Sequence, residues 1–335
     1  MKSYLENRKQ FTLINGKKSN IDDIRYGVPQ GSILGPLLFL LFVNDISKAF
    51  NRCEGKLFAD DTALLLFNRD IHVLVNNAEQ ALSSVDKWFK LNKLSISAGK
   101  STFLLFHSIK KDGQAMIDRL KLGEEYIPRS KHVKYIGLQI DECLTWDHHI
   151  KELCASLCKY FSIFYNIRNC INPSLARIIY YTCIHSRIKY GIEVYGSAKQ
   201  NRIQKLQVIQ NKLMKLLLKR DYTYSTNQLH KDLNILKVSD VHRHATLQFV
   251  YKCVSGKIIP NFRKYFIDRT NIHDHDTRHI RHIYKPIPNI DAGETTTHYI
   301  GATLWNDLTE YIKSAKSIHV FKKRVFNSLI NVYNE

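Results

Sequence analysis

Residues 57–67 read Leu-Phe-Ala-Asp-Asp-Thr-Ala-Leu-Leu-Leu-Phe, so that Asp60 and Asp61 lie side by side inside an otherwise apolar run. This pattern predicts a β-hairpin with the two acids at its tip. Adjacent carboxylates repel each other, and a divalent cation would offset that repulsion. Mg²⁺ prefers oxygen ligands and is commonly held by one or two carboxylates together with substrate phosphates; Mn²⁺ is a second candidate. The pair therefore predicts a metal site, with an exposed Asp-Asp turn as the alternative.

The segment before the acidic pair predicts a strand, a loop and a helix. The strand is expected over residues 11–14. The loop Pro29-Gln30-Gly31-Ser32 then opens a helix that runs to about residue 45. Ser32 is a suitable N-cap, and Pro36 would lie in the first turn, where its missing N–H costs little.

The rest of the chain changes from mixed to helical patterning near residue 145. Apolar side chains recur at helical spacing over 73–89, and alternation predicts strands over 94–97, 102–107 and 133–140. After Trp146 the periodicity predicts four helices, over residues 148–167, 173–187, 201–219 and 238–252. The expected fold class is therefore α+β, with hairpins and helices first and helices alone afterwards.

Charge is distributed unevenly along the 335 residues. Lys and Arg number 50 against 30 acids, a formal net charge of +20. Residues 1–150 hold 21 basic and 17 acidic side chains, whereas residues 151–335 hold 29 and 13. A strongly cationic segment attracts polyanions, and nucleic acid is the usual one. A solvated basic surface without a partner is the alternative.

Composition also limits the cellular context. Hydrophobic residues make up 44% of the chain, enough for a sizeable core. The seven cysteines have irregular spacing, which is typical of reduced residues in an intracellular protein. The longest apolar run, residues 33–43, is too short to span a bilayer. Secretion and membrane insertion are not indicated, and the choice between nucleus and cytoplasm stays open.

Four motifs, in this order, resemble the reverse transcriptases of non-LTR retrotransposons. Residues 26–39 (YGVPQGSILGPLLF) with 43–46 (VNDI) are similar to the nucleotide-pocket motif, and 58–61 (FADD) to the catalytic aspartate motif. Residues 91–97 (LNKLSIS) with Lys100 resemble the next palm motif, and 133–138 (VKYIGL) the primer-grip hairpin. A weaker likeness to the C-terminal region of jockey-like elements follows at 190–196 (YGIEVYG), 206–211 (LQVIQN) and 304–306 (LWN).

The resemblance implies RNA-templated DNA synthesis by two-metal nucleotidyl transfer, with deoxynucleoside triphosphates, an RNA template and a DNA primer as partners. It assigns Asp60 and Asp61 as catalytic metal ligands. Lys100 would lie near the triphosphate as a third catalytic residue, although a solvated turn lysine is an equal alternative. It implies two binding sets: Pro29, Gln30 and Gly31 for the incoming nucleotide, and Tyr135, Ile136 and Gly137 for the primer end.

The family also uses a metal-binding aspartate from an earlier palm motif. The only acids before Gly27 are Glu6, Asp22 and Asp23, and none has the apolar flanks of that motif. We therefore expect the chain to begin inside the palm, without the fingers, and to be inactive by itself. The alternative function is a catalytically dead nucleic-acid-binding remnant. A coincidence of motifs in an unrelated basic helical protein is a third possibility.

Three further clusters have less specific patterns. Cys154 and Cys158, near His148 and His149, allow a zinc site, but core cysteines are the simpler interpretation. The histidine-rich stretch allows a metal site, an RNA contact or a solvated loop; it comprises His273, His275, His279 and His282, with Arg278 and Arg281. A predicted helix near 201–219 has an apolar face and a basic face that would bind phosphates or stay solvated; the basic set is Lys199, Arg202, Lys205, Lys212, Lys215, Lys219 and Arg220.

The resulting hypothesis has three segments. Residues 1–145 form a partial polymerase palm of antiparallel hairpins and helices. Residues 146–200 form a helical thumb, and residues 201–335 form a basic helical C-terminal extension.

Overall fold

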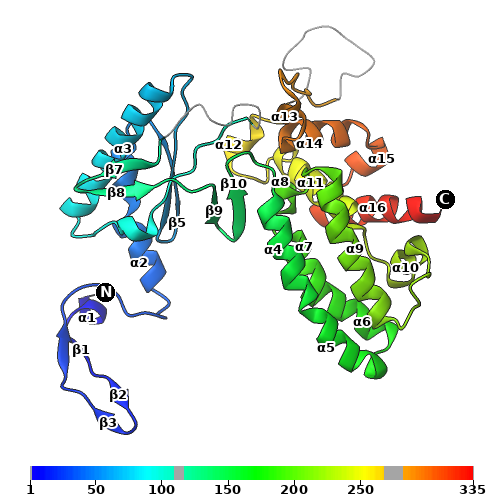
Figure 1. Cartoon of the computed structure of the whole chain (residues 1–335), viewed down its shortest axis with the longest axis horizontal. Coiled ribbons are helices and arrows are strands. Elements are labelled where there is room, and N and C mark those ends of the chain that lie inside the picture. Colours follow the sequence, from blue (N-terminus) through cyan, green and yellow to red (C-terminus); the bar gives the residue numbers. More distant parts are fainter. Residues whose placement is uncertain (1, 109–116, 268–281, 335) are drawn as a thin grey trace. The chain divides into compact units, whose positions relative to one another are not determined.

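The computed structural model describes residues 2–108, 117–267 and 282–334 (Figure 1). The chain divides into two compact units. The first comprises Met1–Leu105 with Ile109–Ser130, and the second Phe106–Ser108 with Lys131–Glu335. Hairpins alternate with helices in the first unit, whereas helices dominate the second. The predicted α+β class is confirmed.

The first unit opens with a short helix and two small antiparallel ladders. Strand β1 pairs with β4, and β2 pairs with β3 across the turn at Asn15-Gly16. Part of the strand predicted over 11–14 is present, because β2 covers its last two residues. The bounds are α1 Lys2–Leu5, β1 Arg8–Gln10, β2 Leu13–Ile14, β3 Lys17–Lys18 and β4 Asp22–Ile24.

The predicted helix after the loop at 29–32 begins later than expected. Helix α2 spans Gly35–Phe42 with Leu34 at the N-cap, and a 3₁₀ helix, η1 (Asn44–Ala49), continues it. The expectation that Ser32 is the N-cap residue is therefore wrong. The Ser32 hydroxyl still accepts the Gly35 N–H (3.1 Å) and donates to the Pro29 carbonyl (2.7 Å). Ser32 thus closes the loop on itself just before the helix.

The acidic hairpin forms as predicted. Strand β5 (Glu54–Phe58) pairs with β6 (Asp61–Leu65), and Phe58 lies opposite Asp61. Ala59 and Asp60 make the two-residue connection. The hairpin begins three residues before the apolar run, because Glu54, Gly55 and Lys56 also join the ladder.

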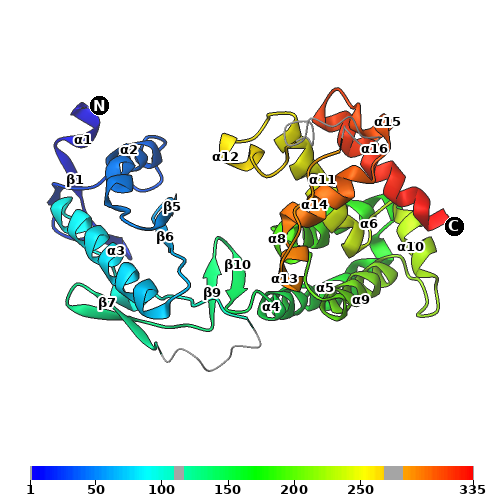
Figure 2. The same ribbon diagram turned by 90° about the horizontal axis from the view of Figure 1, so that it is seen from above.

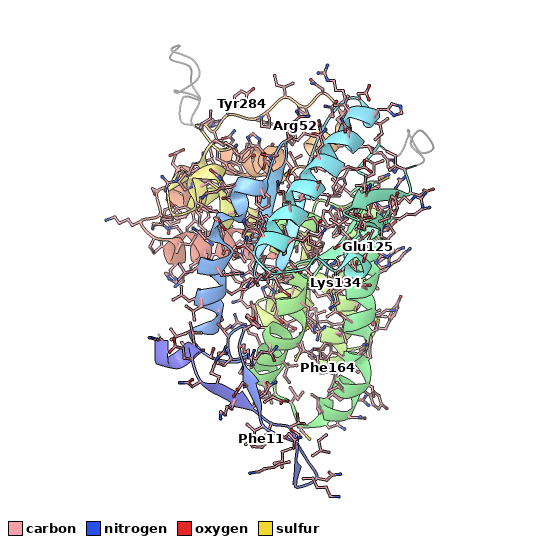
Figure 3. All side chains as sticks on the ribbon, turned by 90° about the vertical axis from the view of Figure 1, so that its left-hand side faces the viewer. Phe11, Arg52, Glu125, Lys134, Phe164 and Tyr284 are labelled. Carbon is pink, nitrogen blue, oxygen red and sulfur yellow. The ribbon has the colours of Figure 1, made fainter. Side chains whose placement is uncertain are left out.

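Helix α3 (Ile71–Leu91) is the long helix of the first unit (Figure 2). Asp70 caps it by accepting the N–H groups of His72 and Val73. Its apolar face packs on the antiparallel pair β7 (Arg119–Leu122) and β8 (Glu125–Pro128), whose first residue Glu125 is labelled in Figure 3. This pair was not predicted, because Leu120, Leu122 and Ile127 are too few for a clear alternating pattern.

The strands predicted over 94–97 and 102–107 are wrong. The 3₁₀ helix η2 (Ala98–Lys100) lies between these segments, and the chain around it is irregular apart from a single bridge between Phe103 and Arg129. Ala98 is buried and Ile96 partly buried in the small core under α3. The apolar side chains therefore reach the core without a ladder, which local alternation cannot distinguish from a strand.

The second unit starts with the hairpin β9 (His132–Tyr135) and β10 (Leu138–Asp141), so the single strand predicted over 133–140 is two strands. β10 packs against α4. The boundary between the two compact units therefore lies near residue 130 of the chain, whereas the sequence predicted a boundary near residue 145. The helices predicted over 148–167, 173–187, 201–219 and 238–252 are all present, with a break at Lys159 and a π-helical segment, η5.

The remaining bounds of the second unit are as follows. The first half consists of α4 Asp147–Cys158, α5 Tyr160–Ile167, η4 Arg168–Cys170, α6 Pro173–Ile179, η5 Tyr180–His185, α7 Ser186–Lys189, α8 Ile192–Tyr195 and α9 Gln200–Leu217. The second half consists of α10 Thr226–Leu233, α11 Val238–Val254, α12 Pro260–Arg263, α13 Asp291–Glu294, α14 Thr297–Asn306, α15 Glu310–Lys313, α16 Ile318–Asn331 and η7 Val332–Asn334.

The core of the second unit runs through both predicted helical segments. Phe164 of α5, Leu206 of α9 and Val241 of α11 belong to one buried cluster, and Phe164 is labelled in Figure 3. Polar groups inside this core join α9 to its neighbours. The Gln210 amide donates to the Tyr180 hydroxyl (2.7 Å) and the Leu236 carbonyl (3.0 Å). Residues 146–200 therefore share one core with α9, α10 and the first part of α11, while the end of α11 packs with α14 and α16 in a second cluster.

Candidate functional site

The acidic pair lies at an exposed β-turn. Ala59 has a φ of 51°, in the left-handed region, and Asp60 follows as the second residue of the connection. A left-handed alanine costs roughly 1–2 kcal/mol, so the hairpin must hold it. Both aspartates are exposed. Their carboxylates thus face solvent from one end of a single hairpin.

Two contacts hold the hairpin and the segment leading into it, residues 50–53, within the first unit. Gly55 of β5 lies against the ring of Phe50, which directly follows η1. Arg52, labelled in Figure 3, donates to the Asn77 side chain on α3 at 3.1 Å. The hairpin is therefore tied to the helix that follows the loop at 29–32. The nearness of Asp60 to Gln30 itself stays a prediction.

The loop proposed to line the nucleotide pocket has a backbone that requires glycine. Gly31 has a φ of +75°, a backbone conformation that favours glycine. An added Cβ would meet no atom within 4 Å, so the preference comes from the backbone and not from steric crowding. Gln30 is exposed and Pro29 partly buried. Arg8 of β1 fixes the segment just before this loop, because its guanidinium donates to the Gly27 carbonyl at 2.7 Å. Arg8 was missed because a lone basic residue in a short strand has no distinctive pattern.

Lys100 ends η2 and is exposed. Its backbone N–H donates to the Ser97 carbonyl at 3.1 Å. An exposed ammonium fits both a triphosphate contact and a solvated turn. Its catalytic role stays a prediction.

The residues expected at the primer end form the tip of the β9–β10 hairpin. Tyr135 pairs with Leu138, so Ile136 and Gly137 are the two turn residues. Both have positive φ, 44° and 77°. These three residues belong to the second unit, whereas Asp60, Gln30 and Lys100 belong to the first.

The donors present suit a hard divalent cation. Across the described ranges 2–108, 117–267 and 282–334, no three His, Cys, Asp or Glu side chains gather as a metal site. Asp60 and Asp61 offer two solvent-facing carboxylates, the oxygen donor set that Mg²⁺ takes when substrate phosphates complete its coordination. The pair therefore fits such an ion as a partial site.

The other metal candidates gain no support. Cys154 packs against the core, as expected, and burial raises the pKa of its thiol. Cys158 is exposed, so the expectation of a core cysteine is wrong there. His149 is buried and accepts the Gln139 N–H through Nδ1 at 3.4 Å. His273, His275, Arg278, His279 and Arg281 lie outside the described residues.

Helix α9 has the predicted two faces. Ile203, Leu206 and Leu213 are buried. On the basic side, Arg202 is occupied by a bidentate ion pair with Asp147, with Nε–Oδ1 at 2.6 Å and Nη2–Oδ2 at 2.8 Å. Among the other members, Lys215 donates to the Tyr222 carbonyl, and Lys205 and Lys212 are exposed. The seven-residue spacing places Lys205 and Lys212 on the same side of the helix.

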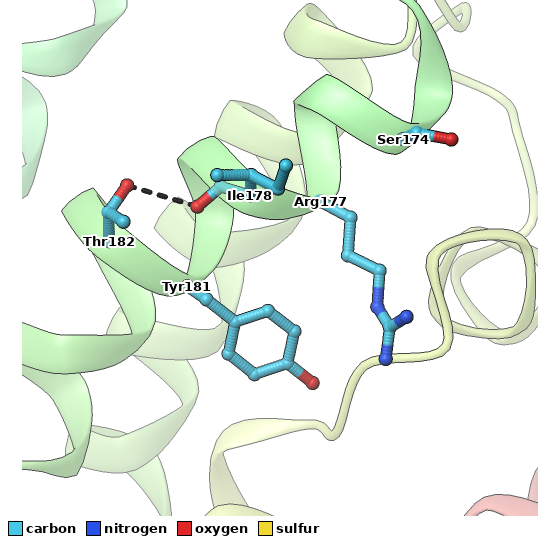
Figure 4. Close-up of a pocket in the computed structure, with 5 residues that line it drawn as sticks. All are labelled: Ser174, Arg177, Ile178, Tyr181 and Thr182. Atoms are coloured by element: carbon cyan, nitrogen blue, oxygen red, sulfur yellow. Dashed lines mark hydrogen bonds between the residues drawn. The ribbon is translucent and has the colours of Figure 1, made fainter.

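A hollow of about 400 Å³ lies on the second unit (Figure 4). Its lining comes from α6 and the π-helical segment: Ser174, Arg177, Ile178, Tyr181 and Thr182. Thr182 donates to the Ile178 carbonyl at 3.0 Å. The hollow contains none of the predicted site residues. No helix of the described residues is both long and apolar enough to cross a membrane.

Comparison with known proteins matches the motif order. Residues 1–140 match the family described as Reverse transcriptase (RNA-dependent DNA polymerase). The probable RNA-directed DNA polymerase from transposon X-element of Drosophila melanogaster is 27% identical over 255 residues, 73% of this chain and 28% of that protein. The RNA-directed DNA polymerase from mobile element jockey, from the same organism, is 27% identical over 250 residues, 72% of this chain and 27% of that protein.

Residues 1–140, the stretch that contains the acidic hairpin, therefore belong to the reverse transcriptase family. The chain is jockey-like, because it is similar to the X-element and jockey proteins over 255 and 250 residues. These alignments are longer than the 140 residues of the family match, so they reach into the second unit. The resemblance drawn from the motifs is thus confirmed. The matched stretch amounts to little more than a quarter of the length of these relatives.

Proposed function

We propose that this chain is part of a reverse transcriptase that performs RNA-templated DNA synthesis by two-metal nucleotidyl transfer in a non-LTR retrotransposon. The observation that carries the proposal is the Asp60–Asp61 turn on a hairpin inside the stretch that matches the family. Two solvent-facing carboxylates on one rigid turn can present their oxygens to cations and phosphates together. An exposed Asp-Asp turn without a role does not account for its position after the loop at 29–32.

Asp60 and Asp61 would hold Mg²⁺, with Mn²⁺ as a second candidate. When bound, such ions stabilise the charge on the attacking and leaving oxygens of an in-line displacement. Pro29, Gln30 and Gly31 would line the site for the incoming deoxynucleoside triphosphate, where the absence of a side chain at Gly31 lets backbone approach the ligand closely. The Lys100 ammonium would stabilise negative charge on the triphosphate.

The partners would be an RNA template and a DNA primer. Tyr135, Ile136 and Gly137 would contact the primer end. Residues 1–145 would act as palm, residues 146–200 as thumb and residues 201–335 as a basic extension that holds backbone phosphates. A copying enzyme must accept any template, so these contacts would carry little sequence information.

The test is primer extension on poly(rA)/oligo(dT) with Mg²⁺. Two proteins are compared: the 335-residue chain, and a joined protein, which is the jockey protein with this chain in place of the stretch it matches. We expect incorporation by the joined protein that falls about 10³-fold or more in Asp60→Asn, since charge stabilisation and positioning each contribute orders of magnitude. The matched control is Asp118→Asn, which removes an exposed acid just before β7 in the same unit and outside the four motifs.

The isolated chain is expected to incorporate little, because Asp60 and Asp61 approach an ion from one hairpin only. Incorporation by the joined protein that is equal in wild type and Asp60→Asn would refute the proposed catalytic role. An inactive joined protein that still binds template–primer would instead favour the catalytically dead remnant.

A further inference from the structure

We propose that Tyr190 is a positioning residue that fixes the tip of the β9–β10 hairpin, and that Gly137 and Gly191, both with positive φ, also leave the space that this contact needs. The inference rests on the proposed function for its consequence, namely the placement of the primer end. Its structural part is independent of that function. All the residues involved belong to the second unit.

The central contact is one hydrogen bond. The Tyr190 hydroxyl donates to the Ile136 carbonyl at 2.7 Å, across 54 residues of chain. Tyr190 lies between α7 and α8, where the helical run breaks before the left-handed Gly191. Its side chain is 53% exposed, so the ring is not there to fill the core. The hydroxyl therefore has a specific partner at the hairpin tip.

The turn that Tyr190 holds has an unfavourable backbone. Ile136 and Gly137 both have positive φ, the pattern of a type I′ hairpin turn, in which Asn-Gly is preferred. Isoleucine is branched at Cβ and rarely adopts this region. Such a conformation persists only where surrounding contacts determine it, and it occurs often at functional sites. The Tyr190 hydrogen bond to Ile136 itself is such a contact.

Two glycines make the contact close. A Cβ on Gly137 would come within 3.0 Å of Tyr190 Cε1, so the ring lies directly on the turn backbone. A Cβ on Gly191 would come within 2.8 Å of both Leu138 methyl groups. Each side of the contact thus has a glycine facing a large side chain of the other side. The β9–β10 hairpin and the segment between α7 and α8 therefore pack closely at two points, Gly137 against Tyr190 and Leu138 against Gly191.

The base of the same hairpin is fixed separately. The Asp141 carboxylate accepts the N–H groups of Thr145 (2.8 Å) and Trp146 (2.7 Å) where the chain enters α4. With the base held by Asp141, loss of the Tyr190 contact would free only the tip. A tip that contacts the primer would then move relative to α4 while the fold stays intact.

The first experiment measures the tip directly by hydrogen–deuterium exchange of the 335-residue chain. In Tyr190→Phe we expect amides of residues 133–140 to exchange roughly fivefold faster, the change that loss of one hydrogen bond produces, with exchange in α9 and the melting temperature unchanged. The control is Tyr222→Phe, since the Tyr222 side chain is 87% exposed and its hydroxyl has no partner in the described part of the chain. Unchanged exchange at 133–140 would overturn the inference.

The second experiment measures the primer end. The chain is bound to an RNA template with a DNA primer that has 2-aminopurine at its 3′ nucleotide. We expect Tyr190→Phe to bind the duplex with wild-type affinity but to give a 3′-end fluorescence signal closer to that of free duplex. Faster exchange with an unchanged signal would overturn the positioning role. A wild-type chain that gives no signal on binding would identify the proposed function, and not the Tyr190 contact, as the error, because exchange still reports the contact.

Discussion

The ring of Phe50 lies directly over Gly55. A Cβ on Gly55 would be 2.1 Å from Phe50 Cε2 and 2.2 Å from Cδ2. Phe50 follows the 3₁₀ helix η1, and Gly55 is the second residue of β5, so this contact joins the helical segment after the loop at 29–32 to the hairpin that bears Asp60 and Asp61. The glycine is required by the ring, not by its own backbone conformation.

Gly55→Ala is therefore expected to destabilise the first unit. The added methyl group must displace an aromatic ring, and overpacking of this kind typically costs about 1–3 kcal/mol. Urea unfolding of the chain measures the loss. Gly99→Ala is the matched control, because a Cβ there meets nothing within 4 Å. The double variant with Phe50→Ala should recover part of the loss, and equal unfolding midpoints for Gly55→Ala and wild type would contradict the contact.

Nucleic-acid affinity is expected to depend on the exposed lysines of α9. Lys205→Gln with Lys212→Gln should weaken binding to template–primer and flatten its salt dependence, because each lost phosphate contact lowers the log–log slope by about 0.9 on a duplex. Filter binding between low and moderate salt measures both. Lys48→Gln with Lys87→Gln removes the same charge from exposed positions of the first unit and should change affinity less. Equal slopes in the two double variants would argue against an α9 binding face.

Stability should fall on mild acidification. Burial lowers the pKa of His185, His230 and His242 from 6.5 to about 4 in the folded chain. Between these values the unfolded chain binds protons that the folded chain does not, so the free energy of unfolding decreases as the pH falls from 6.5 towards 4. Above pH 6.5 this contribution is fully present, and below pH 4 it changes no further.

Urea midpoints measured from pH 7 to pH 4 test this expectation. His242→Gln should reduce the slope of stability against pH, because it removes one of the three buried imidazoles. A second loss is expected at lower pH, because the Arg202 guanidinium holds the pKa of Asp147 below its usual range and protonation of that carboxylate breaks the pair. Stability that is constant from pH 7 to pH 4 would contradict the burial of the three histidines.

Local sequence determined the elements that local chemistry controls. The hairpin turn follows from the polar pair Asp60-Asp61 between apolar segments, and helices α3, α9 and α11 follow from apolar residues at helical spacing. The order of the motifs identified the family for the same reason, because their residues are contiguous. No information about distant segments is needed for either prediction.

Tertiary structure decided the properties that depend on distant partners. Residues 94–97 alternate like a strand but have no neighbouring ladder, so their apolar side chains enter the core from irregular backbone. Gln210 lies in a helix with many polar residues, yet it is buried because Tyr180 and Leu236 supply its hydrogen bonds. Tyr190 and Ile136 are 54 residues apart in the chain and meet only in the tertiary structure. A hydrogen bond or a ladder needs two segments at once, and a pattern along one segment cannot specify the other.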